Sequence, residues 1–73
     1  MFLHQKLKEY REELKLSQED LMKELSKKGI EVSRNTVSSW ENGNTSPGAD
    51  DVANLAIFFN KSISDFFNGT EST

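Results

Sequence analysis

The stretch of residues 32–43, with the sequence VSRNTVSSWENG, constrains the fold of this chain more than any other. Its Ser33 is a good helix N-cap, because the hydroxyl can accept a hydrogen bond from a backbone N–H of the first turn. Its Gly43 is a good helix stop, because glycine enters the left-handed conformation beyond a helix end without steric cost. Between these two signals, Val37 and Trp40 lie three residues apart and share one helical face. The stretch therefore predicts a short amphipathic helix.

Four polar residues of this helix, Arg34, Asn35, Ser38 and Ser39, fall off the apolar face. All four can donate hydrogen bonds, and none carries a negative charge. A helix with arginine and asparagine in its first turn is of the kind that a DNA major groove accepts. Any surface helix also has a polar face, so DNA binding and an ordinary solvated face both stay open at this point.

Apolar residues recur at helical spacing in several segments of the chain. Residues typical of helix starts and helix ends lie between these segments. Ser17 and Asp20 resemble a capping box at the start of one helix. Its end is indicated by two lysines followed by Gly29. The pattern predicts an all-α, compact five-helix bundle without strands. The expected helices run from the first residues to about Glu13, over Gln18–Lys27, over Ser33–Asn42, from Ala49 or Asp50 to Asn60, and from Ile63 to an end at Asn68-Gly69.

A chain of 73 residues without cysteine must be stabilised by packing of apolar side chains, since no disulfide or thiolate metal site can hold it together. A domain of this size buries only about 60–65% of the surface that its unfolded chain exposes. Trp40 shares its face with Val37, so it is expected in the core rather than as a platform for stacked bases. The expected core consists of Leu7, Tyr10, Leu16, Leu21, Leu25, Val37, Trp40, Val52, Leu55, Ala56, Phe59, Ile63 and Phe66.

The net charge of −3 argues mildly against a nucleic-acid partner, but the distribution of charge matters more than the total. Residues 1–30 hold seven Lys and Arg against six Asp and Glu. Residues 49–73 hold one lysine against four acids. The first half of the chain is therefore slightly basic, and the acidic excess lies in the last third.

No apolar run approaches the length of about 18 residues that a membrane span needs. Charged residues also follow the first apolar ones too soon for a signal peptide. We therefore expect a cytoplasmic protein without a membrane partner. His4 stands alone, without the further ligands of a metal site or the nucleophile that a catalytic base would activate. No enzyme activity, metal or cofactor is expected.

Three segments together resemble the phage repressor/Cro-type (XRE-type) helix-turn-helix domain. They are Leu16–Leu21 (LSQEDL), the stretch 32–43, and Ser46-Pro47. The resemblance runs from about Leu7 to Phe67. It implies a lambda-repressor-like helix-turn-helix DNA-binding domain over residues 1–69, with the helix-turn-helix itself at about 17–43, and a flexible tail at 70–73.

The resemblance implies that the helix 33–42 is a recognition helix that enters the major groove. Arg34, Asn35 and Ser39 would then read the bases. An arginine can donate two hydrogen bonds to guanine, and an asparagine can pair with adenine. Contacts to DNA phosphates set position rather than sequence. The resemblance implies such contacts for Ser17, Gln18, Ser38, Asn42, Asn44 and Thr45.

Glu41 would bring a negative charge next to the expected DNA face, where it would repel phosphate. In the family, this acid pairs with an arginine of the first helix, and Arg11 matches that arginine. The resemblance therefore implies a partly buried, structural ion pair between Arg11 and Glu41.

The connection between the two motif helices departs from the family, whose turn there is usually tighter. Residues 25–33 (LSKKGIEVS) are several residues longer, which implies a second helix extended by a turn. Lys27 and Lys28 could touch phosphate or could simply be solvated, and both interpretations stay open.

The resemblance implies a transcriptional regulator of prokaryotic or phage type. It would bind an operator with two half-sites in double-stranded DNA, as a homodimer at least on DNA. A second function stays open: a small helix-turn-helix modulator or antirepressor that acts mainly by binding a partner regulator protein. The acidic last third, the longer turn and two spare phenylalanines favour it. Phe58 and Phe67 are expected either to form an exposed protein interface or to be partly buried against the tail.

Overall fold

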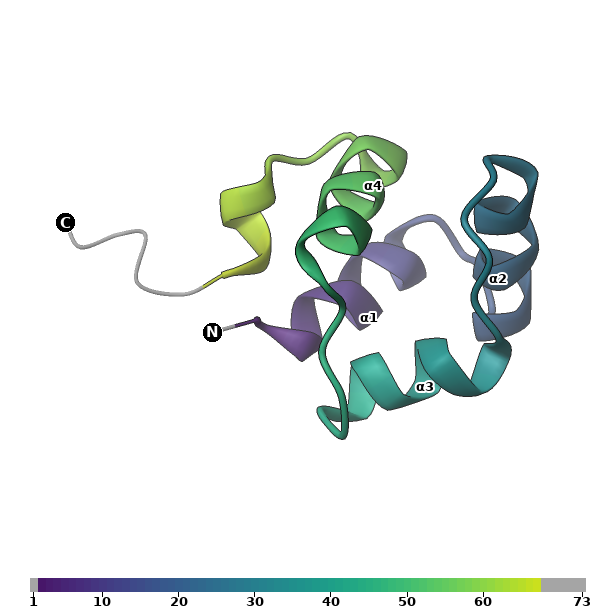
Figure 1. The fold of residues 1–73 in the computed structure, drawn as a ribbon, viewed down its shortest axis with the longest axis horizontal. Helices are drawn as coiled ribbons and strands as arrows, with labels where there is room; N and C mark the ends of the chain where they lie inside the picture. The colour runs from purple at the N-terminus through teal and green to yellow at the C-terminus, as the bar shows by residue number, and fades with distance from the viewer. Residues whose placement is uncertain (1, 68–73) are drawn as a thin grey trace, which may run out of the picture.

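The structure, a computed structural model, describes residues 2–67, and these residues form helices joined by short connections (Figure 1). An isolated antiparallel bridge joins Phe2 and Phe67 near the two ends of the described chain. The predicted all-α class is confirmed. The helices are α1 (His4–Glu13), α2 (Gln18–Lys27), α3 (Arg34–Asn42), α4 (Ala49–Phe59) and the 3-10 helix η1 (Ile63–Phe66).

Local signals determine where α2 and α3 begin and where α3 ends. The Ser17 hydroxyl accepts a hydrogen bond from the Asp20 N–H at 3.0 Å, and the Asp20 carboxylate accepts one from the Ser17 N–H at 3.3 Å. This reciprocal pair is the capping box that the sequence predicts. The Ser33 hydroxyl accepts from the Thr36 N–H at 3.0 Å. Gly43 ends α3 in the left-handed conformation, with φ at 82°.

The prediction of five α-helices is wrong for the last element, because residues 63–66 form a 3-10 helix. That helix ends at Phe66, since Phe67 adopts an extended backbone and pairs with Phe2. The Leu3 N–H also donates to the Phe66 carbonyl at 2.7 Å. The N-terminal segment thus competes for the backbone groups that a longer helix would use. The expected end at Asn68-Gly69 and the tail at 70–73 lie outside the described residues.

The core differs from the prediction at three positions. Ile63 is half exposed, because it lies at the start of η1 and outside the aromatic cluster that Phe66 joins. Leu16 is half-buried against the core. Phe2 lies outside the expected core, but it is buried with its ring stacked on that of Phe66 at a centroid distance of 5.8 Å. The buried core is formed by Phe2, Leu7, Tyr10, Leu21, Leu25, Val37, Trp40, Val52, Leu55, Ala56, Phe59 and Phe66.

Phe58 and Phe67 pack against the core, so the expectation of an exposed phenylalanine patch is wrong. The Phe58 ring meets the Phe59 ring edge to face at 5.0 Å. The Phe67 ring meets the Phe2 ring in the same way at 6.0 Å. Both phenylalanines are half-buried, and the expected cover by the tail concerns residues outside the described ones. Within residues 2–67, the large apolar side chains that are exposed are Leu14, Ile57 and Ile63.

The arrangement of the helices leaves one long edge of the molecule to α3 (Figure 1). In that view α3 runs along the bottom, α2 stands at one end, and α4 lies on the upper side. The connection 28–33 returns from the far end of α2 to the start of α3. The loop that follows α3 turns up towards α4 at the opposite end. The outward side of α3 and this loop therefore share one edge.

Candidate nucleic-acid interface

The buried face of α3 determines which of its residues point outward. Val37 and Trp40 are fully part of the core, where α3 packs against α1 and α2. Burial of these two residues places the opposite side of the helix in solvent. Asn35, Ser39 and Asn42 follow one another along that side at spacings of four and three residues.

The three candidate base-reading residues differ in exposure. Arg34 and Asn35 are exposed in the first turn of α3, whereas Ser39 is half-buried. The loop after the helix folds back towards Ser39, whose carbonyl accepts from the N–H groups of Asn44 at 3.0 Å and Thr45 at 3.4 Å. The N-terminal turn of α3 is therefore open to a partner, which would meet Arg34 and Asn35 there.

An ion pair between Arg11 of α1 and Glu41 of α3 lies directly behind this surface. The Arg11 Nε donates to Glu41 Oε2 at 2.6 Å, and Nη2 donates to Oε1 at 3.0 Å. Nη1 donates to the carbonyl of Leu16 at 2.7 Å, and Gln18 Nε2 donates to Glu41 Oε1 at 3.1 Å. Both charged side chains are buried. The network joins α1, α2 and α3, and it directs the Glu41 charge inward.

Arg11 is well suited to a buried position, because its guanidinium is held by directional partners. The hydrogen bond to Glu41 raises the pKa of Arg11 above its ordinary value. The negative charges of Glu41 and Glu12 act in the same direction, and burial acts against them. Among residues 2–67 no buried side-chain nitrogen or oxygen lacks a hydrogen-bond partner. Arg11 is therefore a structural cation and is not available to a phosphate.

Two of the candidate phosphate-contacting residues sit at the N-terminal end of α2, and both are partly engaged. Ser17 is exposed, and its hydroxyl oxygen accepts the capping hydrogen bond. Its O–H remains a donor. Gln18 is half-buried and uses one of its amide N–H groups on Glu41, which leaves the second as a donor. Each residue can therefore offer one hydrogen bond to a phosphate.

The other candidate phosphate-contacting residues follow the outward side of α3 into the loop. Asn42, Asn44 and Thr45 are exposed, and Ser38 is half-buried. The Asn42 Nδ2 donates to the Ser38 hydroxyl at 3.3 Å, so these two side chains are joined. The structure thus brings this set onto the same edge as Arg34 and Asn35 (Figure 1).

Lys27 and Lys28 lie at the end of α2 that points away from α3 (Figure 1). Lys27 pairs with Glu24 at 3.3 Å, and the Lys28 Nζ lies 5.9 Å from the centre of the Phe58 ring on α4. The two lysines therefore do not belong to the edge formed by α3. The α2 helix ends at Lys27, and residues 28–33 form the connection.

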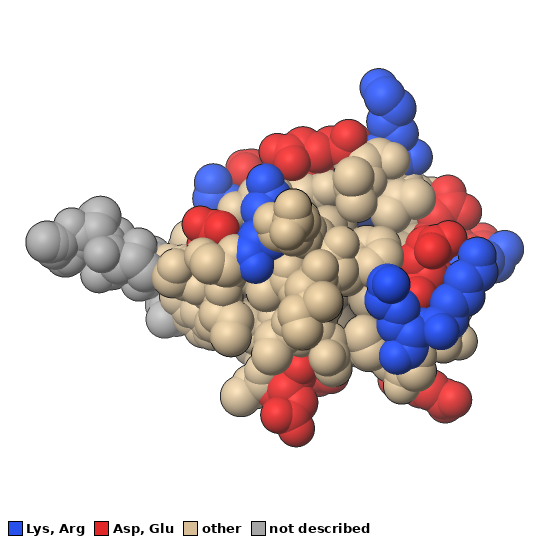
Figure 2. All heavy atoms as spheres, turned by 90° about the horizontal axis from the view of Figure 1, so that it is seen from above, with Lys and Arg blue, Asp and Glu red and all other residues tan. Residues whose placement is uncertain are grey.

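The side of the molecule opposite α3 carries charges of both signs. Figure 2 views it from the α4 side, where basic and acidic side chains lie around an uncharged area and neither sign dominates. A duplex of uniform negative charge has no extended basic surface to bind on that side.

A family model described as Helix-turn-helix matches residues 7–66. The chain therefore belongs to this family, the XRE-type helix-turn-helix proteins. Its fold and family together define a DNA-binding domain of transcription regulators, whose partner is double-stranded DNA. No curated protein and no solved structure gives a significant match to the chain.

In the part of the chain that the structure describes, no helix is both long and apolar enough to cross a membrane. No group of three or more His, Cys, Asp or Glu side chains in residues 2–67 could hold a metal ion.

His4 stands alone in the sequence, but in the structure it lies against Gly43, where the loop after α3 begins. A Cβ atom at Gly43 would lie 3.1 Å from two atoms of the His4 ring. No local pattern could have indicated this contact, because His4 and Gly43 are far apart in the sequence and meet only when α1 packs beside the end of α3.

Proposed function

We propose that the chain is a sequence-specific transcriptional regulator of repressor or Cro type that inserts α3 into the major groove of an operator. Arg34, Asn35 and Ser39 would contact base edges. The observation that carries this proposal is the exposure of Arg34 and Asn35 in the first turn of a helix whose other side is anchored in the core. Arginine to guanine and asparagine to adenine are pairings of two hydrogen bonds that distinguish one base pair from another in the major groove.

The proposed phosphate contacts frame this helix at both ends. Ser17 and Gln18 lie before it at the start of α2, and Asn42, Asn44 and Thr45 lie after it. Hydrogen bonds from these residues would fix the register of α3 on the duplex without reading sequence. Arg34 is the one cation within α3, so a monomer gains little electrostatic affinity. A homodimer on two half-sites about one helical turn apart would supply the rest.

The test starts from DNA sequences enriched by the chain itself from a random duplex library. Arg34→Ala should lose about 1–3 kcal/mol of discrimination at one base pair of each half-site. Lys27→Ala is the matched control, since it removes one positive charge at the far end of α2 and should leave discrimination unchanged. Affinity of the wild type should fall steeply as salt is raised. No enrichment of any sequence at low salt and micromolar protein would overturn the proposal.

A protein-binding modulator is the second candidate function. The observation that favours it is the exposure of Ile57, which is 77% accessible on the side of α4 away from the core. The net charge of −3 also favours a protein partner, because it opposes binding to DNA. If this function holds, Ile57→Asp should abolish capture of a DNA-binding partner while Arg34→Ala has no effect on it.

A further inference from the structure

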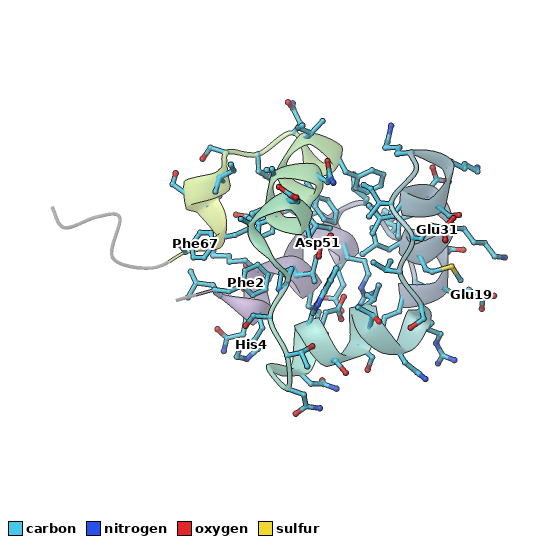
Figure 3. All side chains as sticks on the ribbon, viewed as in Figure 1. Phe2, His4, Glu19, Glu31, Asp51 and Phe67 are labelled. Carbon is cyan, nitrogen blue, oxygen red and sulfur yellow. The ribbon has the colours of Figure 1, made fainter. Side chains whose placement is uncertain are left out.

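The ring of His4 lies flat against the residue where α3 ends. A Cβ atom built on Gly43 would lie 3.1 Å from both Cε1 and Nδ1 of His4 and 3.4 Å from Nε2. Three ring atoms at nearly the same distance mean that the imidazole covers the α-carbon of Gly43 with its face. In Figure 3, His4 points from the start of α1 towards the end of α3 and the loop that follows it.

Gly43 is the point where the loop leaves the helix. Its φ of 82° turns the chain, and its own N–H donates to the carbonyl of Ser39. The N–H groups of Asn44 and Thr45 donate to that same carbonyl. Any movement of Gly43 would therefore also shift the side chains that follow it.

The backbone at His4 belongs to a regular element, since His4 is the first residue of α1. The two residues before it are tied to the other end of the fold by the Phe2–Phe67 bridge and by the hydrogen bond from the Leu3 N–H to the Phe66 carbonyl. The backbone at His4 is therefore restrained on both sides, by α1 after it and by these contacts before it. His4 thus presents its imidazole to Gly43 from a restrained backbone.

We propose that His4 is a positioning residue for DNA binding. Its ring holds Gly43 in place and thereby aligns Asn42, Asn44 and Thr45 with the phosphate backbone. This inference rests on the proposed function, because it assumes that the loop meets DNA. The contact itself is tested without DNA, so failure of the inference and failure of the proposed function can be distinguished.

The first test is amide hydrogen exchange on the full chain. His4→Ala should speed exchange of the Asn44 amide at least tenfold, while amides in the middle of α4 keep their wild-type rates. His4→Phe keeps a flat ring and should retain wild-type protection of Asn44. Gln5→Ala, which truncates the exposed neighbour of His4, is the control. Unchanged exchange of Asn44 in His4→Ala, or equal loss in His4→Phe, would overturn the inference.

The second test is a double-variant cycle between His4 and Gly43, followed by thermal unfolding. Gly43→Ala lowers the Tm both through the strained backbone and through contact with the imidazole. In the His4→Ala background only the backbone strain remains. The drop in Tm caused by Gly43→Ala should therefore be smaller there, by about 4–8 °C. Equal drops in both backgrounds would show that the ring does not hold Gly43.

The DNA arm of the test compares an enriched operator with a mismatched one. His4→Ala should weaken binding to both by the same factor, about threefold to tenfold, since phosphate contacts carry no sequence information. Arg34→Ala should instead change the ratio between the two DNAs. If His4→Ala frees the Asn44 amide but leaves both affinities unchanged, the loop does not position DNA and the inference fails while the proposed function stands.

Discussion

Arg11 and Glu41 show how one pair of residues can serve a whole motif. The two-point contact between guanidinium and carboxylate is completed by the Leu16 carbonyl and by Gln18. These partners satisfy the donors and acceptors that burial would otherwise leave without partners, which is the condition for a stable buried ion pair. The pair thus fixes α3 relative to α1 while keeping a carboxylate away from the outward side of α3.

Removal of both partners of this pair should cost far less than the sum of the two single removals. Arg11→Met leaves the Glu41 carboxylate buried beside Gln18 alone and should reduce the free energy of unfolding by about 3–5 kcal/mol. The double variant Arg11→Met/Glu41→Leu should be markedly less destabilised than the sum of the two single variants. Urea denaturation of all four chains measures this coupling. Additive losses would mean that the charges do not depend on each other.

The raised pKa of Arg11 also determines how this stabilisation varies with pH. A group whose pKa is raised on folding contributes stability that is fully present below its unfolded value and is lost as the pH rises through the folded value. For an arginine, that loss lies at strongly alkaline pH. The contribution of Arg11 should therefore be constant in urea denaturation across neutral pH. The loss of unfolding free energy caused by Arg11→Met should be the same at about pH 6 and about pH 9, since both values lie far below the pKa of an arginine. A difference between the two would contradict this.

The roles of individual residues could be predicted to different extents. Burial of Val37 and Trp40 followed from their spacing, because a helix with one apolar face can bury only that face. The partner of Glu41 came from the family resemblance, since charge alone would not select Arg11 from the other cations. The contact of His4 with Gly43 and the burial of Phe2 depend on how distant segments meet, and neither has a local signal.

At the scale of elements, the cap of α3 links stability to the candidate interface. The Ser33 hydroxyl binds the Thr36 N–H in the same turn that presents Arg34 and Asn35. Ser33→Ala should cost about 0.5–2 kcal/mol of unfolding free energy. It should also increase exchange of the Thr36 amide and weaken operator binding, because the turn proposed to read the bases would fray. Unchanged Thr36 exchange would show that this turn does not depend on its cap.

The bounds of α2 could be predicted because a capping box and a lysine-rich end enclose it, so that both ends are encoded within a few residues. The bounds of the last element, η1, could not be predicted from the sequence. Ser62 and Asp65 provide a helix start, but the chain beyond Phe66 pairs with Phe2 instead of continuing the helix. A start signal tells nothing about a distant segment that competes for the same backbone groups.

At the scale of the whole molecule, aromatic contacts join the two ends of the described chain. Phe2 stacks on Phe66 and meets Phe67 edge-on, and Phe66 in turn meets Tyr10 of α1 edge to face at 5.3 Å. The cluster joins α1 to η1 near the N-terminus (Figure 3). In a chain of 73 residues without disulfides, such a cluster is a large part of the core.

Phe2→Ala should therefore destabilise the molecule as a unit. Loss of a buried phenylalanine costs about 3–5 kcal/mol, and Phe2 should lie near the lower value because it sits at the edge of the core. In a domain of this size that corresponds to a fall in Tm of roughly 12 °C or more. Ile57→Ala is the matched control, since Ile57 is exposed and its truncation should change stability by no more than about 0.5 kcal/mol. Calorimetry measures the Tm of both variants. Similar Tm values would mean that the contacts of Phe2 add nothing to the stability of the fold. The backbone before His4 would then not be restrained by these contacts, and His4 would lose the support from which it holds Gly43.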